Sequence, residues 1–460
     1  MTSYVQADAL FWDGEFRTGM ALRLTASGAT PVPLNRIPDL SVMRRLPGTL
    51  LPGLVDAHVH SGLVDLATVR AGGIAGVWDL GSVPTAIAAL AARAAGARVA
   101  RGADAARRRG AGAAQPREAG AAQARWAGTA HPGGAGGAGA GHAGRADPSA
   151  AARVDEASAA HAAATGVARA GGAGAAPVGG AAPAGGSAGA LLSPTPSLGG
   201  GEDTARVRQF SWAVPSIRYA GPFLIAPGGY PSDRSWAAPG SWRAIDSAAE
   251  GADAVREAHA GGATLIKMTA HAGGPLLSLP TMTAVAGAAH DLGLPVVVHA
   301  EGPGAVVMAY EAGADFLAHT PWTESLDGGL VRSCAERMRW ISTLDIHGWG
   351  TPTPEQATAV GNLRRFLEYG GSVRYGTDLG NGPLIPGVNA REIRALQSAG
   401  LNPAEILAAM TGIEPTTPGD NSTTTAADVC WIPGGLDLDP ARFADVLATA
   451  RVLDDSVRPR

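Results

Sequence analysis

The hydrophobic residues of this chain fall into short continuous runs, separated by longer stretches in which apolar and polar residues recur with helical spacing. Eight such runs lie between residues 50 and 377. They are Leu50–Val55, Ile74–Leu80, Ile217–Ile225, Thr264–Met268, Pro295–His299, Asp315–His319, Trp340–Ile346 and Val373–Thr377. Continuous rather than alternating hydrophobicity indicates strands that are buried on both faces, as in parallel sheets.

The stretches between these runs carry the helical patterns. They are Pro84–Ala95, Ser247–His259, Thr281–Leu292, Gly304–Ala312, Gly328–Met338, Pro354–Tyr369 and Ala390–Ala399. Eight strands that alternate with helices predict an α/β fold of the (β/α)8 TIM-barrel type. Eight is also a strand number at which a parallel sheet can close on itself and leave no edge.

The two ends of the chain have a different pattern, in which short β-type segments are broken by Gly, Pro and Asn. We expect residues 1–48 and 419–460 to pair into one small β-sandwich domain. The barrel would then comprise residues 49–92 and 214–418, inserted between the two halves of this domain.

The exception to both patterns is a low-complexity insert at 93–213. Residues 101–200 hold 36 Ala and 23 Gly, with almost no large apolar side chains. Such a composition cannot bury enough apolar area to offset the entropy of ordering the chain. We therefore expect a disordered insertion, and a locally shifted reading frame in a GC-rich gene is the alternative origin of this segment.

The overall composition excludes several classes of protein. A net charge of −4 and a pI near 6.3 do not favour nucleic acid as a partner. No run of 18 apolar residues predicts a membrane helix, and the N-terminal residues do not resemble a signal peptide. Cys334 and Cys430 form no CxxC pair, which suits a reducing compartment. We expect a cytoplasmic protein.

Residues that bind metals or protons recur where the predicted strands end. His58 and His60 follow the first run, and residues i and i+2 of an extended chain point the same way. Active-site residues of such barrels come from the C-terminal ends of several strands. The other residues of this kind are Lys267, His299, His319 and Asp378.

Lys267 stands out because it is the only lysine, the other 35 of the 36 basic side chains being arginine. A buried lysine amine can lose its proton and become a nucleophile, whereas an arginine cannot readily do so. One alternative is that a single lysine survived a strong compositional bias. Because four histidines and an aspartate also lie at predicted strand ends, a chemical role for Lys267 is favoured.

With these motifs, about 1–92 and 214–460 resemble the amidohydrolase superfamily of metal-dependent hydrolases, in its two-metal subtype. The motifs are Pro52-Gly-Leu-Val-Asp-Ala-His58-Val-His60, Lys267, His299, His319 and Gly376-Thr-Asp378. The loops Ala226–Tyr230 and Lys267–Gly274 look most like the branch of imidazolonepropionase-like proteins and Xaa-Pro or Xaa-Arg dipeptidases.

The resemblance implies that CO2 carboxylates Lys267 to a carbamate bridging two divalent metal ions. His58, His60 and Asp378 would hold one ion, and His299 and His319 the other. Imidazole nitrogens and carboxylate oxygens suit Zn2+ best and also accept Mn2+, Co2+ or Fe2+.

The resemblance further implies hydrolysis of an amide or other C–N bond in a small molecule by a hydroxide that bridges the two ions. Asp378 would be the catalytic residue that moves the proton. Tyr230, His271 and His347 lie in the loops that would bind the substrate.

Two alternatives remain open. The same scaffold could serve a deaminase or a lactonase, because fold and metals do not fix the substrate. The barrel could also be a non-catalytic binding or assembly protein, although all six ligand positions are present. The sequence leaves self-association into a homo-oligomer open.

Overall fold

The computed structural model describes residues 3–25, 28–96, 214–412, 426 and 428–453. The predicted insert at 93–213 lies outside the described residues, apart from its first four positions. Residues 84–96 are helical, which confirms the helix predicted at Pro84–Ala95.

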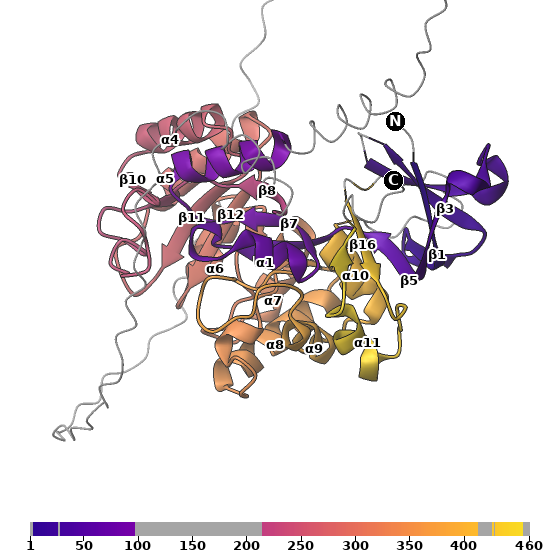
Figure 1. Cartoon of the computed structure of the whole chain (residues 1–460). Coiled ribbons are helices and arrows are strands. Elements are labelled where there is room, and N and C mark those ends of the chain that lie inside the picture. The colour runs from indigo at the N-terminus through magenta and orange to yellow at the C-terminus, as the bar shows by residue number, and fades with distance from the viewer. Residues whose placement is uncertain (1–2, 26–27, 97–213, 413–425, 427, 454–460) are drawn as a thin grey trace, which may run out of the picture. The chain divides into compact units, whose positions relative to one another are not determined.

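Seven strands from both ends of the chain form one sheet (Figure 1). Its strands are β1 (Ser3–Trp12), β2 (Glu15–Arg17), β3 (Met20–Thr25), β4 (Gly28–Pro33), β5 (Arg44–Pro52), β16 (Val429–Ile432) and β17 (Arg451–Val452). β16 runs antiparallel to β5 and joins the two ends of the chain. The predicted pairing of the termini is confirmed, although the described strands hydrogen-bond into a single sheet and not into two.

Three short 3-10 or α-helical elements accompany this sheet. They are η1 (Leu34–Arg36), η2 (Leu40–Val42) and α11 (Pro440–Leu447). The β-type pattern predicted for residues 419–460 does not hold throughout, because Pro440–Leu447 form the helix α11. The helix begins there because Asp439 caps it, accepting a hydrogen bond from the backbone N–H of Ala441, and Pro440 occupies its first turn.

The remaining strands are parallel and form two hydrogen-bonded sheets. The first holds β6 (Leu54–Val59), β7 (Ile74–Asp79) and β8 (Ser216–Tyr219). The second holds β10 (Trp242–Ala244), β9 (Phe223–Ile225), β11 (Ile266–His271), β12 (Val296–Glu301), β13 (Phe316–Leu317), β14 (Arg339–Ile341) and β15 (Ser372–Arg374), in that order.

Backbone hydrogen bonds join these two sheets at both seams. At one seam, β8 pairs with β7 while β9 pairs with β11, so that β8 and β9 are two halves of one interrupted strand. At the other seam, the N–H of Ala57 donates to Tyr375 at 2.9 Å and that of His60 donates to Leu379 at 2.8 Å. The parallel strands therefore close into a ring with eight strand positions, as the alternating pattern predicted.

Helices follow the strands around this ring. They are α1 (Leu66–Ala71), α4 (Ala248–Ala260), α5 (Leu279–Asp291), α6 (Ala305–Glu311), α7 (Gly328–Arg337), α8 (Pro354–Glu368), α9 (Ala390–Ala399) and α10 (Pro403–Thr411). Two further 3-10 turns, η3 (Ser61–Leu63) and η4 (Asp345–His347), follow β6 and β14. Phe443 and Leu447 of α11 belong to the same apolar core as the barrel.

The predicted first barrel strand, Leu50–Val55, was wrong in its bounds. β5 ends at Pro52 and belongs to the terminal sheet, whereas the barrel strand β6 starts at Leu54. Gly53 marks the change of partner, because its N–H donates to Asp428 and a Cβ there would lie 2.9 Å from the Cβ of Ala75. A continuous apolar run does not reveal that its pairing partner changes partway.

The position of Lys267 within its strand was also wrong. β11 continues to His271, so that Lys267 is its second residue and not its last. Thr269 and Ala270 extend the strand because they pair with His299 and Ala300 of β12. Since alternate residues of a strand share a face, Lys267 and His271 point to the same side of β11.

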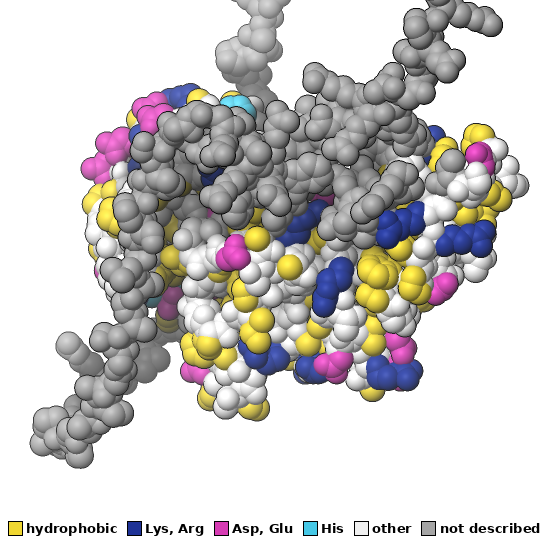
Figure 2. Space-filling view, in the orientation of Figure 1, with side chains coloured by type: hydrophobic (Ala, Val, Ile, Leu, Met, Phe, Trp, Pro, Cys, Tyr) yellow, Lys and Arg dark blue, Asp and Glu magenta, His cyan; other side chains and the backbone are white. Residues whose placement is uncertain are grey.

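The surface carries no large field of one charge on the face shown in Figure 2, where arginine and acidic side chains are interspersed in the described part. Both cysteines are buried and free. Among the described residues, no helix combines the length and hydrophobicity needed to cross a membrane.

Candidate metal centre

Two histidines and one aspartate meet at a single carboxylate oxygen where the ring closes. The Nε2 atoms of His58 and His60 each lie 3.1 Å from Oδ1 of Asp378. All three residues are buried, with exposed fractions of 1%, 6% and 4%. The strand β6 supplies His58, His60 follows directly after it, and the loop after β15 supplies Asp378.

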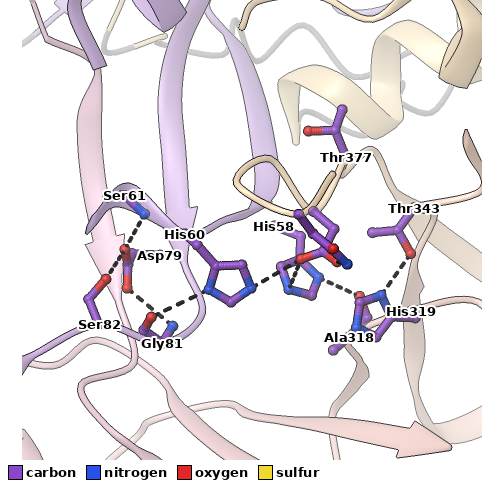
Figure 3. A network of polar contacts seen from close by, with 12 residues as sticks. His58, His60, Ser61, Asp79, Gly81, Ser82, Ala318, His319, Thr343 and Thr377 are labelled. Atoms are coloured by element: carbon purple, nitrogen blue, oxygen red, sulfur yellow. Dashed lines mark hydrogen bonds and ion pairs between the residues drawn. The ribbon is translucent and has the colours of Figure 1, made fainter. Parts of the chain in front are cut away.

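The other ring nitrogens of these histidines contact backbone carbonyls, as Figure 3 shows. Nδ1 of His58 lies 2.8 Å from the oxygen of Ala318, and Nδ1 of His60 lies 3.4 Å from that of Gly81. Because a carbonyl oxygen only accepts, Nδ1 of His58 carries the proton and its Nε2 presents a lone pair to Asp378.

This donor set fits a divalent cation. Burial lowers the pKa of His58 well below its usual value, so the imidazole is neutral. Burial opposes ionisation of Asp378, but its contacts with His58 and His60 hold the pKa of that carboxyl well below its usual range. Apart from these two imidazoles, Oδ1 of Asp378 is buried and has no hydrogen-bond partner among the described residues. Lone pairs that converge on such an oxygen are stabilised by a metal ion between them.

The backbone of Asp378 is itself unusual. Its φ of 56° lies in the left-handed region, which few residues other than Gly, Asn and Asp adopt. This turn aims the carboxylate back across the end of β6, where His58 and His60 lie.

Lys267 is almost completely buried, with an exposed fraction of 1%. Its ammonium nitrogen lies 5.7 Å from the centre of the Phe223 ring. Burial lowers the pKa of the amine to about 7, although Asp378 opposes this shift. A substantial fraction of neutral amine is therefore present near neutral pH, which is the form that can react with CO2.

His319 and His299 lie beside the first group. The ring of His319 lies 4.5 Å from that of His58 and 5.0 Å from that of His299, centre to centre. Nδ1 of His319 contacts the hydroxyl of Thr343 at 3.0 Å, which leaves its Nε2 free for a ligand. Nε2 of His299 contacts Oε2 of Glu301 at 2.9 Å, which leaves its Nδ1 free.

A second group of residues that could hold a metal ion shares His299 with the predicted ligands. Ligand atoms of His271, His299 and Glu301 all lie within 4.8 Å of one another. Oε2 of Glu301 contacts both histidines, at 2.9 Å from His299 and 3.1 Å from His271. Because Glu301 accepts from Nε2 of His299, the same contact can orient that ring towards an ion held through Nδ1.

The three predicted substrate residues all lie close to these histidines. The Tyr230 ring stacks on His299 with centres 4.6 Å apart and lies 5.1 Å from His271. His347 stacks on Trp322 at 4.8 Å, and Trp322 lies 5.4 Å from His319. The structure thus brings together residues that are up to 320 positions apart in the chain, as His58 and Asp378 are.

Sequence reasoning missed three residues that fix the ligands. Asp79 ends β7 and accepts hydrogen bonds from the N–H groups of Ser61 and Gly81 and from the hydroxyl of Ser82 (Figure 3). The other two are Asp56, which binds the N–H of His58, and Thr343. Asp79 could have been found, because it is a carboxylate at a strand end, whereas the Thr343 contact depends on a left-handed φ of 45°.

A closed ring of parallel strands, with histidines and carboxylates gathered at its strand ends, defines a barrel hydrolase with a metal-binding cluster. The chain belongs to the amidohydrolase family, whose model matches residues 49–413. The match extends across both sides of the Ala/Gly-rich segment.

Solved structures share this fold at low sequence identity. A Xaa-Pro dipeptidase with bound methionine is 14% identical, with a TM-score of 0.58 and coverage of 100% of both chains. A prolidase complexed with N-methylphosphonate-L-proline is 14% identical over 99% of this chain and 98% of that one, with a TM-score of 0.57. A. niger ochratoxinase is 15% identical over 98% of this chain and 94% of that one, with a TM-score of 0.58. A search of curated proteins found no match.

Proposed function

We propose that the chain binds two divalent metal ions, Zn2+ being favoured, and hydrolyses an amide or other C–N bond of a small molecule. The observation that carries this proposal is the convergence of two histidine Nε2 atoms on one unsatisfied carboxylate oxygen of Asp378. The proposed ligands are His58, His60, Lys267, His299, His319 and Asp378.

In this proposal Lys267 acts as a carbamate. An ammonium group would repel two cations, whereas a carbamate offers two anionic oxygens that can each bind one ion. The low pKa of about 7 supports this role, since the neutral amine is the reactive form. The side chain of Lys267 is only 1% exposed, which also shields the carbamate from water.

Metal ions bound at this site would polarise the substrate carbonyl and lower the pKa of a water molecule. Asp378 is ionised and buried beside His58, so it can accept a proton from the attacking water and pass it to the leaving nitrogen. Tyr230 can donate a hydrogen bond from its hydroxyl to the substrate, because burial raises the pKa of that group above its usual value and keeps it protonated. His271 and His347 would contact other parts of the substrate.

The group of His271, His299 and Glu301 supports a variant of this assignment. In that variant, His271, His299 and Glu301 hold the second ion. Lys267 and His319 do not bind it. Replacing Glu301 with Gln would abolish binding of the second ion in the variant, and would only weaken it if Glu301 orients His299.

The test is metal analysis together with a substrate screen. The protein is purified with Zn2+ or Mn2+ and bicarbonate, and assayed with N-acyl amino acids, dipeptides and cyclic amides. About two ions per chain and turnover of at least one amide are expected. Two ions with turnover of only an aminopurine-type or lactone substrate would favour the deaminase or lactonase alternative, and no ions and no turnover would favour the non-catalytic barrel.

Three broader assignments belong to the same proposal. The domains are a β-domain of 1–48 and 419–460, a barrel of 49–92 and 214–418, and an insert of 93–213. The cytoplasmic location and homo-oligomerisation stay predictions.

A further inference from the structure

Trp322 and His347 form a stacked pair on one side of the candidate metal centre. Their ring centres lie 4.8 Å apart with an angle of 29° between the planes. Trp322 also lies edge-on to His299 at 5.8 Å and to His319 at 5.4 Å. Both Trp322 and His347 are partly exposed. The pair therefore presents a flat surface that begins directly beside the proposed ligands.

The loop that carries His347 is fastened from two sides. The hydroxyl of Thr353 donates to the His347 carbonyl at 2.5 Å. Two residues earlier, the buried carboxylate of Asp345 accepts from Nε of Arg391 at 2.9 Å and from Nδ2 of Asn389 at 2.8 Å. Such anchoring holds the imidazole in place before a ligand arrives, which lowers the entropy lost on binding.

The contacts of Asp345 also determine the charge beside the Trp322–His347 pair. The guanidinium of Arg391 binds the same loop, and Asp345 neutralises its charge through contacts with Nε and a second nitrogen at 2.9 Å. Burial lowers the pKa of His347 to about 4, so that its imidazole is neutral at physiological pH. Neither His347 nor the paired Arg391 therefore offers an uncompensated positive charge to a carboxylate.

One polar atom of this pair lacks a partner. Nε2 of His347 is buried and makes no hydrogen bond within the described part of the chain. An unsatisfied buried nitrogen costs free energy that a ligand can recover by hydrogen bonding to it. The pair thus combines a planar apolar face with one hydrogen-bonding atom.

We propose that Trp322 and His347 determine specificity, selecting amides that carry a planar, uncharged group beside the bond to be cleaved. The aromatic ring of the substrate packs against Trp322, and a carbonyl or other neutral polar atom binds Nε2 of His347. This inference rests on the proposed function, because the proposed metal centre determines where the substrate is cleaved.

The experiment measures binding and needs no turnover. Calorimetric or NMR titrations compare benzamide with cyclohexanecarboxamide, which has the same carbon skeleton in a non-planar ring, and with the charged 4-carbamoylbenzoate. Zinc-loaded protein is expected to bind benzamide about three- to tenfold more tightly than either comparator, the range that an added aromatic pair gives.

Two substitutions separate the two parts of the pair. Trp322→Leu should abolish the preference for benzamide over cyclohexanecarboxamide. His347→Phe keeps an aromatic ring against Trp322 but removes the nitrogen, so it should weaken both amides and keep their ratio. Trp349→Leu is the matched control, because Trp349 lies on the same loop with 43% exposure and packs near Gly382, and its ratio should equal that of the wild type.

Equal binding of the two uncharged amides by the wild type would overturn the inference, as would an unchanged ratio in Trp322→Leu or tighter binding of 4-carbamoylbenzoate. Failure of the proposed function would look different. The protein would then bind no zinc and cleave no amide, while the same titrations of the metal-free protein would still report on Trp322 and His347.

Discussion

The carboxylate of Asp56 binds Thr377 twice, accepting from its backbone N–H at 3.0 Å and from its hydroxyl at 2.5 Å. It also accepts from the N–H of His58 at 3.0 Å. Asp56 lies on the first barrel strand, and Thr377 directly precedes Asp378. These three hydrogen bonds therefore set the distance between His58 and Asp378, the two residues on which the proposed metal site depends.

Removing this carboxylate should destabilise the protein strongly. Asp56→Ala leaves three donors buried without a partner, and each costs about 1–3 kcal/mol, so a loss of at least about 3 kcal/mol is expected. Thr377→Val removes one hydroxyl and should cost about 1–2 kcal/mol. Urea unfolding of metal-free protein measures both, with the partly exposed Thr358→Val as a control that changes stability by less than about 0.5 kcal/mol. Wild-type stability of Asp56→Ala would contradict this role.

Carboxylation of Lys267 should depend on pH. The folded pKa of about 7 lies below the usual value of 10.5, so the amine is mostly protonated below pH 7 and mostly neutral above it. Carbamate formation releases two protons from the ammonium form and one from the neutral amine. At a constant concentration of dissolved 13CO2, the carbamate signal in 13C NMR should therefore rise from pH 6 to pH 8, less steeply above pH 7, until every Lys267 is carboxylated. Lys267→Arg should show no signal and should lose bound metal. A signal that does not change between pH 6 and pH 8, or full activity of Lys267→Arg, would refute the carbamate.

The barrel could be predicted because its strands are buried on both faces, which leaves continuous apolar runs such as Val296–Val298 in β12. The proposed ligands followed because strand ends of a parallel barrel meet at one face. The boundary at Gly53 could not be predicted, because pairing partners are set by tertiary contacts with Asp428 and Ala75 and not by local hydrophobicity.

The residues that hold the loops around the site were harder to find. Glu392 is fully buried in α9 and accepts from the N–H groups of Leu344 and Asp345, 47 or more positions away. Its sequence neighbours give the pattern of an ordinary amphipathic helix. A side chain that acts through a distant backbone has no local signature, so only the folded chain reveals it.

Thr343 should tune metal affinity through His319. Thr343→Val keeps the shape of the side chain but removes the hydroxyl that contacts Nδ1 of His319 at 3.0 Å. The imidazole then loses its fixed orientation, and zinc affinity should fall about 10- to 100-fold. Competition with a chromophoric chelator measures this change, and circular dichroism checks the fold. An unchanged affinity would show that His319 does not need this contact.

Asp378 can be tested with little structural change. Asparagine also tolerates a φ of 56°, so Asp378→Asn should fold normally while losing the negative charge and the proton acceptor. Turnover should fall at least about 100-fold, the lower end of the contribution of a general base. The zinc content should fall as well, measured by plasma mass spectrometry. Full turnover of the variant would mean that another residue moves the proton.

Gly81 should be intolerant of any side chain. Its φ is +154°, and a Cβ at this position would lie 2.0 Å from the Phe223 ring. The displaced turn would carry with it the carbonyl that contacts Nδ1 of His60. Gly81→Ala should therefore lower both the melting temperature and the zinc affinity. Gly434→Ala is the matched control, because a Cβ there meets nothing within 4 Å, and it should change neither quantity. If Gly81→Ala lowered the melting temperature but left zinc affinity unchanged, the Gly81 carbonyl would have no part in orienting His60.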